Sequence, residues 1–282
     1  MTVKIIKKFN NNVIMSLNDK SQEVILIGNG LGFGVSPGDT INKDKIEKTF
    51  VIDNDYNRET VYDFLSDIPK EQLELTKDII ELTENLLKVQ LNDYLYLSLS
   101  DHLYYAFKRH KSGTDISNPL LNEIQKIYPK EYEAAMLALQ LIFESTGTKL
   151  AKDEAGFIAL HFVNAQQGQI TINETMKIPK MIKEILRIIE FHFSIQLDTS
   201  SISYDRFITH LKYFIKRSID SNEEEHNSQT NVMLQSLRMN TPKIYDCVEK
   251  ISEYMQKTQE VTINEDEKFY LFVYIYKLTT KE

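Results

Sequence analysis

The feature that most constrains the fold of this chain is an internal repeat. Four short motifs recur in the same order. They are VQLND at 89–93 and IQLDT at 195–199, HLYYAFKR at 102–109 and HLKYFIKR at 210–217, PKEY at 129–132 and PKIY at 242–245, and DEAGFIALH at 153–161 and DEKFYLFVY at 266–274. The offsets between partners are 106, 108, 113 and 113 residues, so the second copy is slightly longer. Four collinear pairs predict two tandem copies of one domain.

The apolar spacing in both copies is that of amphipathic helices. It is clearest at Ile79, Ile80, Leu82, Leu86 and Leu87 in the first copy and at Met181, Ile182, Ile185, Leu186 and Ile189 in the second. We therefore expect two all-α helical-bundle domains, at residues 67–172 and 173–282. They meet in the polar stretch 166–178, and some of the extra length of the second copy falls in the polar segment 221–231.

The first 57 residues have a different pattern, in which short runs rich in β-branched residues alternate with turn residues. We expect strands at 3–9, 13–17, 23–28 and 48–53, and hence a small all-β domain at 1–57. The polar stretch 53–60 is the best linker candidate, and we place the linker at 58–66. Because a domain of this size buries only about 60% of its unfolded surface, we expect a homodimer that completes its core.

Composition limits the functional classes. The lone cysteine, Cys247, cannot form an internal disulfide, and no secretory signal opens the sequence, so we expect a cytoplasmic protein. No run of about 18 uncharged apolar residues occurs, which excludes membrane insertion through an ordinary spanning helix. The net charge of −8 argues against non-specific coating of nucleic acid, which needs many Lys and Arg to neutralise phosphates. Any nucleic-acid contact is therefore expected to be local and specific.

Two histidines occupy equivalent positions of the repeat, and each is followed seven residues later by an arginine. The pairs are His102 with Arg109 and His210 with Arg217. Seven residues are close to two helical turns, so each pair shares a helix face. Imidazole is a nucleophile near neutral pH, and guanidinium complements a phosphate group, so the pair can carry a phosphoryl group. The alternative is a structural histidine on a packed helix, and both interpretations stay open.

A third histidine, His161, ends an apolar run that predicts a buried helix, and its counterpart in the second copy is Tyr274. Tyrosine fills a similar volume but cannot replace imidazole as a nucleophile at neutral pH, since its pKa is about 10. We interpret His110, His192 and His226 as surface or packing residues. The chain lacks pairs of His or Cys at metal-ligand spacing, so we expect no metal site and no cofactor.

The glycine-rich stretch GNGLGFG at 28–34 does not have the spacing of a dinucleotide-binding loop. Alternating glycines in a strand region indicate bulges or close approach of the backbone to a partner. Phe33 in this stretch can stack on an RNA base, or it can be a core residue of a tightly turned sheet. The chain also lacks a nucleotide loop, a metal cluster and a nucleophile elbow, so we expect that it is not an enzyme.

The motifs together resemble those of BglG/LicT-type transcriptional antiterminators. The resemblance covers nearly the whole chain and rests on FNNNVI at 9–14, IGNGLGFG at 27–34, PGD at 37–39, IEK at 46–48 and the SDH and ALH histidine motifs. It implies a dimeric co-antiterminator RNA-binding domain followed by two regulation domains of the sugar phosphotransferase system. Proteins of this kind bind a hairpin in a leader transcript, prevent an overlapping terminator from forming and let transcription continue.

By the same resemblance, the phosphoryl acceptors are His102, His161 and His210, with Tyr274 at the place of the fourth histidine. The partners implied are the phosphocarrier HPr, which often activates through the second regulation domain, and a sugar-specific enzyme II, which represses through the first. A phosphoryl group adds roughly −1.5 to −2 charges, so it can either repel neighbouring subunits or hold them together through arginines.

The resemblance also implies a set of RNA-contact residues. These are Lys7, Asn10, Asn12, Gly28, Asn29 and Phe33. This chain departs from the family pattern at Asn29, where Lys or Arg is usual, and at Val35 and Ser36, where a basic residue is common. Fewer phosphate contacts predict lower RNA affinity with a weaker salt dependence. A phosphorylation-controlled regulator that acts through protein partners, with weak or altered RNA binding, is therefore the alternative function.

Overall fold

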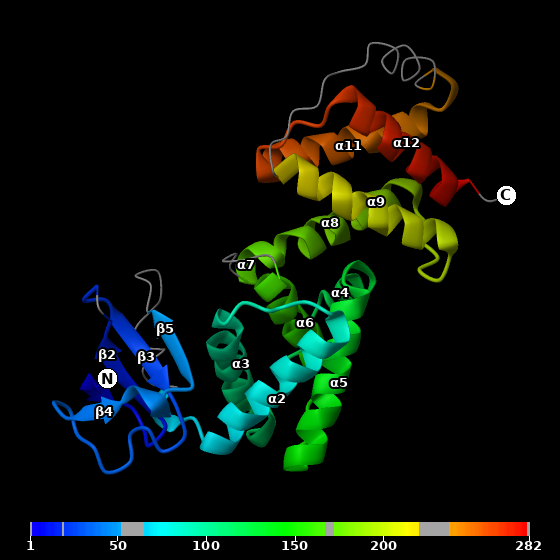
Figure 1. Cartoon of the computed structure of the whole chain (residues 1–282). Coiled ribbons are helices and arrows are strands. Elements are labelled where there is room, and N and C mark those ends of the chain that lie inside the picture. Colours follow the sequence, from blue (N-terminus) through cyan, green and yellow to red (C-terminus); the bar gives the residue numbers. More distant parts are fainter. Residues whose placement is uncertain are drawn as a thin grey trace. The chain divides into compact units, whose positions relative to one another are not determined.

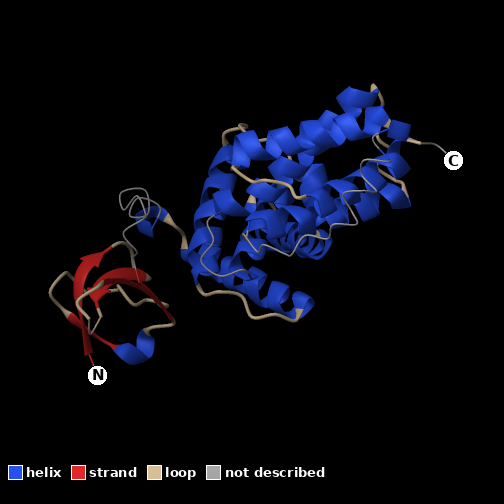
Figure 2. Cartoon of the chain, turned by 90° about the horizontal axis from the view of Figure 1, so that it is seen from above, coloured by secondary structure: helices blue, strands red, loops and turns tan. Residues whose placement is uncertain are grey.

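The computed structural model describes residues 2–18, 20–51, 65–166, 172–219, 237 and 239–280. Strands are confined to the N-terminal part, and the described residues after it are mostly helical (Figures 1 and 2). This confirms the predicted fold class, a small all-β region followed by all-α regions. The linker predicted at 58–66 and the polar segment at 221–231 lie largely or wholly outside the described residues.

The N-terminal sheet has five antiparallel strands in the order β4-β1-β2-β3-β5. The strands are β1 (Thr2–Lys8), β2 (Val13–Leu17), β3 (Glu23–Ile27), β4 (Thr40–Asn42) and β5 (Lys48–Val51), with a short 3-10 helix, η1 (Lys43–Lys45), before β5. The four predicted strands are present. The prediction missed β4, which has only three residues and follows a Pro-Gly-Asp turn, too short a run to show a period of two.

Alternate residues of the strands lie on opposite faces of the sheet, as the period of two requires. One face contributes Ile14 and Leu26 to a cluster completed by Ile5, Val24, Leu31 and Ile41. The neighbouring residues Met15 and Ile27 lie in a second cluster. Both faces of this thin sheet are therefore covered by apolar contacts.

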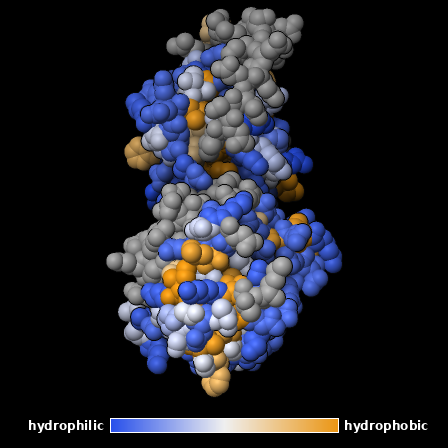
Figure 3. Space-filling model, turned by 60° about the vertical axis from the view of Figure 1, so that its left-hand side comes forward, coloured by the Kyte–Doolittle hydropathy of each residue, from blue (hydrophilic) through white to orange (hydrophobic). Residues whose placement is uncertain are grey.

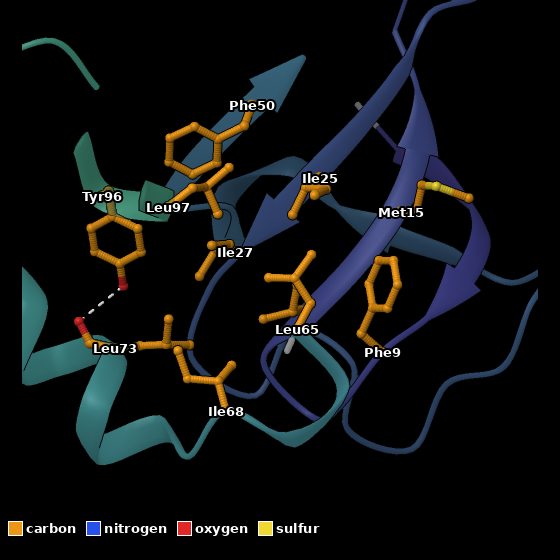
Figure 4. Close-up of a cluster of buried hydrophobic side chains, with 11 residues drawn as sticks. Phe9, Met15, Ile25, Ile27, Phe50, Leu65, Ile68, Leu73, Tyr96 and Leu97 are labelled. Atoms are coloured by element: carbon orange, nitrogen blue, oxygen red, sulfur yellow. Dashed lines mark hydrogen bonds between the residues drawn. The ribbon is translucent and has the colours of Figure 1, made fainter. Parts of the chain in front are cut away.

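The second cluster joins the sheet to the helical region (Figure 4). Phe9, Val13, Met15, Ile25, Ile27 and Phe50 of the sheet region pack with Leu65, Ile68, Leu73, Tyr96 and Leu97. The rings of Phe50 and Tyr96 stack with centroids 6.0 Å apart, and the Tyr96 hydroxyl donates to the Leu73 carbonyl at 3.1 Å. Residues 1–57 therefore do not bury their core alone, because one sheet face is completed by the first helices.

Apolar side chains also remain at the surface of the sheet region. Ile6, Leu17, Val51 and Phe33 are exposed, and Phe33 keeps 75% of its surface. Figure 3 turns the side with the sheet forward and shows hydrophobic residues among hydrophilic ones there. The pairing of Leu17 with Glu23 and of Val51 with Val24 places these two side chains on opposite faces of the sheet.

The first copy of the repeat contains five described helices. They are α2 (Lys70–Leu87), α3 (Tyr94–Lys111), α4 (Leu121–Ile127), α5 (Pro129–Thr146) and α6 (Asp153–Gln166). The periodic residue Ile79 of α2 is fully buried, whereas Leu86 near its end is 41% exposed. Helix α3 lies against both α2 and α6, which places the histidine of its SDH motif near the histidine at 161.

The second copy repeats this pattern. It contains α8 (Lys177–Phe193), α9 (Ile202–Ile219), α11 (Pro242–Gln259) and α12 (Glu265–Thr279), preceded by the short α7 (Ile172–Thr175). The four recurring motifs fall at corresponding places: VQLND and IQLDT follow the ends of α2 and α8, the other three lie in corresponding helices, and PKEY and PKIY begin α5 and α11. In the described residues, no helix is both long enough and apolar enough to cross a membrane.

The repeat extends to individual hydrogen bonds. Helices α2 and α8 both end on a residue in the left-handed conformation, Lys88 with φ 57° and Ser194 with φ 55°. Three residues after each of these, a backbone N–H donates to the side chain of the glutamate seven residues before it. Leu91 donates to Glu84 at 2.8 Å, and Leu197 donates to Glu190 at 3.0 Å. These pairs keep the offset of 106 residues, so the duplication is structural and not only a likeness of sequence.

The chain divides into two compact units, residues 1–118 with 130–169, and residues 119–129 with 170–282. Helix α4 therefore belongs to the unit of the second copy although it precedes α5 in the chain. Lys126 in α4 pairs with Asp205 at 2.7 Å, and Lys212 donates to the Ile127 carbonyl at 2.9 Å. The domain boundaries predicted at 67–172 and 173–282 stay a prediction, because a division by sequence repeat and a division into compact units are different things.

Candidate functional site

The turn after β1 and the glycine-rich loop after β3 lie against each other at one end of the sheet. Gly28 donates its backbone N–H to the Asn12 carbonyl at 3.0 Å, and Gly32 donates to the Asn11 carbonyl at 2.9 Å. The loop is a turn and not part of a strand, which corrects the assignment of this stretch to a strand region. The predicted close approach of backbone is present, since a Cβ on Gly28 would clash with the Lys45 carbonyl oxygen.

Asn10 and Asn12 have different roles in this end of the sheet. The Asn10 side chain accepts from the backbone N–H groups of Asn12 at 2.7 Å and Val13 at 2.9 Å, and donates to the Leu65 carbonyl at 2.8 Å. Its polar atoms are therefore engaged within the protein. Asn12 accepts from the Gly30 N–H at 2.9 Å through its Oδ1 and leaves its amide NH2 without a partner among the described residues.

Three other predicted RNA-contact residues are exposed at or near this end. Phe33 projects from the loop with three quarters of its surface exposed, which excludes the alternative that it is a core residue. The Lys7 ammonium lies 5.1 Å from the centroid of the Phe9 ring. Asn29 is exposed, and its backbone N–H donates to the Glu47 carboxylate at 3.0 Å.

The two departures from the family pattern lie next to carboxylates. Glu47 is bonded to the backbone of Asn29, and Asp39 accepts from the Ser36 N–H at 2.8 Å. Val35 packs partly against the apolar cluster of Ile5 and Leu31. These positions therefore add no positive charge to the loop and have acidic neighbours.

The first histidine site is formed by α3 and α6. His102 and His161 have ring centroids 5.0 Å apart. Glu154 of α6 lies between the two residues predicted to share a face of α3: its Oε2 is 2.9 Å from the His102 Nε2, and its Oε1 accepts from Arg109 at 2.9 Å. The Nδ1 of His161 is 3.4 Å from the Ser98 hydroxyl.

This site is closed to solvent. Glu154 is 1% exposed and His161 is 6% exposed, and the Nε2 of His102 is also shielded. Burial by itself would raise the pKa of Glu154, but the contacts and charges of His102 and Arg109 outweigh it, so its pKa is lowered. Burial, helped by the charge of His102, lowers the pKa of His161 well below its usual value. The site therefore holds an ionised carboxylate beside a neutral imidazole.

The second histidine site is formed by α9 and α12 and is open. The rings of His210 and Tyr274 have centroids 4.6 Å apart and are inclined by 33°. They line a cavity of about 280 Å³ together with Ser203, Arg206 and Lys277. Burial raises the pKa of Tyr274, with Arg206 partly opposing the shift, so its hydroxyl stays protonated at neutral pH. Arg217 is exposed and is not among the residues that line the cavity.

The other histidines have local structural partners. His110 contacts the Asp115 carboxylate at 3.1 Å. His192 contacts the Lys243 carbonyl at 2.8 Å and the Lys250 ammonium at 3.0 Å. His226 lies outside the described residues. In the part of the chain that the structure describes, no group of His, Cys, Asp and Glu is arranged to hold a metal ion.

The prediction from sequence missed Glu154, Arg206 and Lys277 as site residues. Helical spacing gives a signal for the two cations, because Arg206 is one turn before His210 and Lys277 is one turn after Tyr274. Glu154 opens α6, seven residues before His161, but its contact with His102 and Arg109 depends on how α6 packs against α3.

Comparison with known proteins agrees with this architecture. The sequence model of the CAT RNA binding domain matches residues 3–59, and that of the PRD domain matches residues 77–165 and 183–278. The chain is 38% identical over 273 residues to the transcription antiterminator LicT of Bacillus subtilis strain 168, covering 97% of this chain and 98% of that protein. It is 34% identical over 281 residues to the beta-glucoside operon antiterminator of Dickeya chrysanthemi, covering 99% and 98%. A solved structure described as GlcT CAT-PRDI is 33% identical and covers 60% of this chain and all of its own, with a TM-score of 0.48.

Proposed function

Because the chain belongs to the family of LicT- and BglG-type transcription antiterminators, we propose that it binds a leader-mRNA hairpin as a homodimer and prevents formation of an overlapping terminator. Its relatives are regulatory RNA-binding proteins and not enzymes, as expected from sequence. We place its action in the cytoplasm, under control of histidine phosphorylation by the sugar phosphotransferase system. The single observation that carries the proposal is the order of the matched domains, one RNA-binding domain followed by two PRD domains.

The geometry of the sheet end supports RNA binding. Phe33 offers an exposed ring on which a base can stack, and the free amide of Asn12 can donate to a base edge or a phosphate. Lys7 supplies a positive charge nearby. Gly28 keeps the loop backbone close to η1, so its contribution is to shape the surface. The internal bonds of Asn10 support a role in fixing the turn that presents Asn12 and not in touching RNA directly.

Dimer formation is supported by apolar surface on the strands. Ile6 of β1, Leu17 of β2 and Val51 of β5 are each at least 40% exposed. Leu17 and Val51 lie on opposite faces of the sheet, since their partners Glu23 and Val24 are adjacent in β3. A second copy that covers either one removes apolar surface from water, which favours association. Sedimentation of the full chain measures the mass directly, and a monomer at concentrations that bind RNA would contradict the dimeric part of the proposal.

The switch requires transfer of a phosphoryl group to histidine. A ring nitrogen of the accepting histidine attacks phosphorus of the phosphorylated carrier HPr or enzyme II. The new N–P bond forms while the bond from phosphorus to the carrier atom breaks, and that atom takes the electron pair and the proton that the accepting ring loses. The proposed acceptors are His102, His161 and His210. In the first site, Arg109 is the proposed partner of the phosphoryl group, after its guanidinium has separated from Glu154.

Accessibility separates these acceptors. The described conformation presents His210 to solvent, whereas the ring nitrogen of His102 next to Glu154 and the ring of His161 are buried. Transfer to the first site therefore requires that α3 and α6 separate locally, at a cost in free energy that transfer to His210 does not carry. We infer that the two regulation domains respond to different donors for this reason.

Phe33→Leu tests the RNA-binding part of the proposal in the full chain. The full chain is used because one sheet face packs on the helices. Loss of one base stack costs about 1–3 kcal/mol, or roughly 5- to 150-fold in Kd for the leader hairpin. Phe191→Leu is the matched control, because Phe191 is 86% exposed on α8 in the other unit. A salt-titrated mobility shift measures both, and equal binding by the two variants would contradict the proposed surface.

The alternative, a regulator that acts through protein partners, is favoured by the charge of the loop. Asn29 and Ser36 carry no positive charge, and the carboxylates of Glu47 and Asp39 are bonded to their backbones. If this alternative holds, the full chain binds the hairpin weakly even at low salt, and the restored cation in Asn29→Lys strengthens binding. Strong, saturable binding by the natural chain removes the alternative.

A further inference from the structure

The cavity beside His210 differs in charge from the equivalent place in the first copy. Five residues line it, Ser203, Arg206, His210, Tyr274 and Lys277, and none is acidic. Its volume of about 280 Å³ lies at the lower edge of the roughly 300–1,000 Å³ that is usual for small-molecule sites. The space therefore suits a small polyatomic group better than a nucleotide.

The two cations of the cavity are uncompensated. Among the described residues, neither Arg206 nor Lys277 makes an ion pair. Asp205, next to Arg206 in the chain, is paired with Lys126 at 2.7 Å. The remaining polar groups of the wall, the Tyr274 hydroxyl and the Ser203 hydroxyl, can both donate hydrogen bonds. The lining thus consists of donors and positive charge around one imidazole.

The repeat shows how the cavity lining differs from the equivalent positions of the first copy. Arg206 stands where the first copy has Ser98, and Lys277 where it has Asn164, at the same offsets as the histidine pair and the His161–Tyr274 pair. Ser203 stands where the first copy has Leu95, which is 2% exposed. At these positions the second copy therefore has two cations in place of neutral side chains and a small residue in place of a buried leucine.

The counterpart of the carboxylate that closes the first site takes part in a helix cap in the second. Glu267 is the counterpart of Glu154, but it forms a capping box with Asn264: its carboxylate accepts from the Asn264 N–H at 3.3 Å, and its own N–H donates to the Asn264 side chain at 2.9 Å. It is therefore used at the start of α12. In the first site a protein carboxylate contacts both the histidine and Arg109. In the second, the cavity beside His210 is lined by Ser203, Arg206 and Lys277, the counterparts of Leu95, Ser98 and Asn164.

We propose that Arg206 and Lys277 bind a phosphoryl group in this cavity, with Tyr274 as a hydrogen-bond donor, either while the group is attached to His210 or as a free phosphate ion. The inference rests on the proposed function in one respect, that His210 accepts a phosphoryl group. It assigns the phosphate-binding cations of the second domain to Arg206 and Lys277, in place of Arg217. Guanidinium and ammonium together suit a dianion, since Arg binds two oxygens in a fork and Lys binds as a point charge.

Labelling with phosphoramidate tests the proposal without any protein partner. A ring nitrogen of His210 attacks phosphorus, the N–P bond to the donor nitrogen breaks, and ammonia leaves with the proton from the ring. The full chain is labelled, and phosphate on the peptide that contains His210 is followed by mass spectrometry. Arg206→Ser and Lys277→Asn, which restore the residues of the first copy, are each expected to slow labelling of His210 about tenfold or more. Arg206→Lys is expected to recover part of the loss.

Matched variants make the result specific. Arg187→Ser on α8 and Lys257→Asn on α11 remove exposed cations of the same unit and are expected to leave labelling unchanged. Arg217→Ser decides between the two assignments, and we expect a change of less than about twofold, because an exposed charge outside the cavity is screened. Natural labelling rates in both Arg206→Ser and Lys277→Asn, or a large loss in Arg217→Ser alone, would overturn the proposal.

A titration with inorganic phosphate separates the two sources of the phosphoryl group. If free phosphate slows labelling in a saturable way that Arg206→Ser abolishes, the cavity also binds the free ion; if it does not, the cavity holds the group only on His210. Both results agree with binding of a phosphoryl group by Arg206 and Lys277. If only the proposed function is wrong, a different result is expected. Phosphoramidate would still label His210, and the labelling would still depend on Arg206 and Lys277, but phosphorylated HPr would transfer no phosphate to the chain.

Discussion

The two histidine sites occupy the same place in the same helical scaffold but are opposite in charge and access. In the first, the buried Glu154 carboxylate contacts both His102 and Arg109. In the second, His210 borders a solvent-accessible cavity with two cations and no carboxylate. The two copies thus share their backbone, including the glutamate bonds after α2 and α8, while a few side chains give the two sites different chemistry.

The largest effect is expected on removal of the carboxylate of the first site. Glu154→Ala leaves the partly buried Arg109 and the shielded nitrogen of His102 without their partner. Breaking such a contact costs about 3 kcal/mol of unfolding free energy, which urea denaturation measures. Glu267→Ala, the matched change in the second copy, removes one side of the capping box of α12 and is expected to cost about 1 kcal/mol. Equal losses in the two variants would break the comparison.

The pH dependence of stability gives the next effect. Burial lowers the pKa of His161 in the folded chain, while in the unfolded chain it stays near 6.5. Below about pH 6.5 the unfolded state therefore binds one more proton, so the unfolding free energy falls as pH falls, by up to about 1.4 kcal/mol per pH unit. Above that pH His161 is neutral in both states and does not change the unfolding free energy with pH. Tyr274, at the equivalent place, does not titrate in this range.

His161→Gln isolates this contribution. Denaturation curves of the natural chain and the variant at pH 7.5 and 5.5 are compared, and the natural chain is expected to lose more stability than the variant between the two values. Other titrating groups are common to both chains and cancel. An identical pH dependence would show that His161 is accessible to protons in the folded chain, contrary to a closed first site.

The smallest effect concerns the capping box of α12, formed by Asn264 and Glu267. Asn264→Ala removes the acceptor for the Glu267 N–H and is expected to cost about 1 kcal/mol or less, as for other N-caps. Asn42→Ala, which removes the cap of η1 in the sheet region, is a control for the loss of an Asn cap elsewhere. A cost above about 2 kcal/mol would mean that the capping box also positions α12 against α9.

Much of the fold was predictable because it depends on periodicity and repetition. Strands of five or more residues and helices such as α2 and α8 have enough alternation for their period to be recognised. The strand β4 was not predictable because three residues carry no period. The placement of α4 with the second copy depends on ion pairs such as Lys126 with Asp205, to which the sequence repeat gives no signal.

The sites were predictable only in part. The equivalence of His102 and His210 is visible in sequence because the flanking motifs align. The residues around each histidine were not visible in the sequence. A comparison of repeats identifies the residues that the two copies share, whereas Arg206 and Lys277 stand at positions where the copies differ. The internal use of Asn10 was also hidden, since its bond to Leu65 joins residues 55 apart in the chain. The functional roles of the predicted residues stay proposals.

Site-resolved transfer of phosphate from phosphorylated HPr to the full chain distinguishes an open second site from a closed first one. Phosphate is expected to reach His210 before His102 and His161, and a variant with all three histidines replaced by alanine is expected to take up none. Full labelling of the triple variant, or labelling of His102 as fast as of His210, would contradict the account of an open second site and a closed first one.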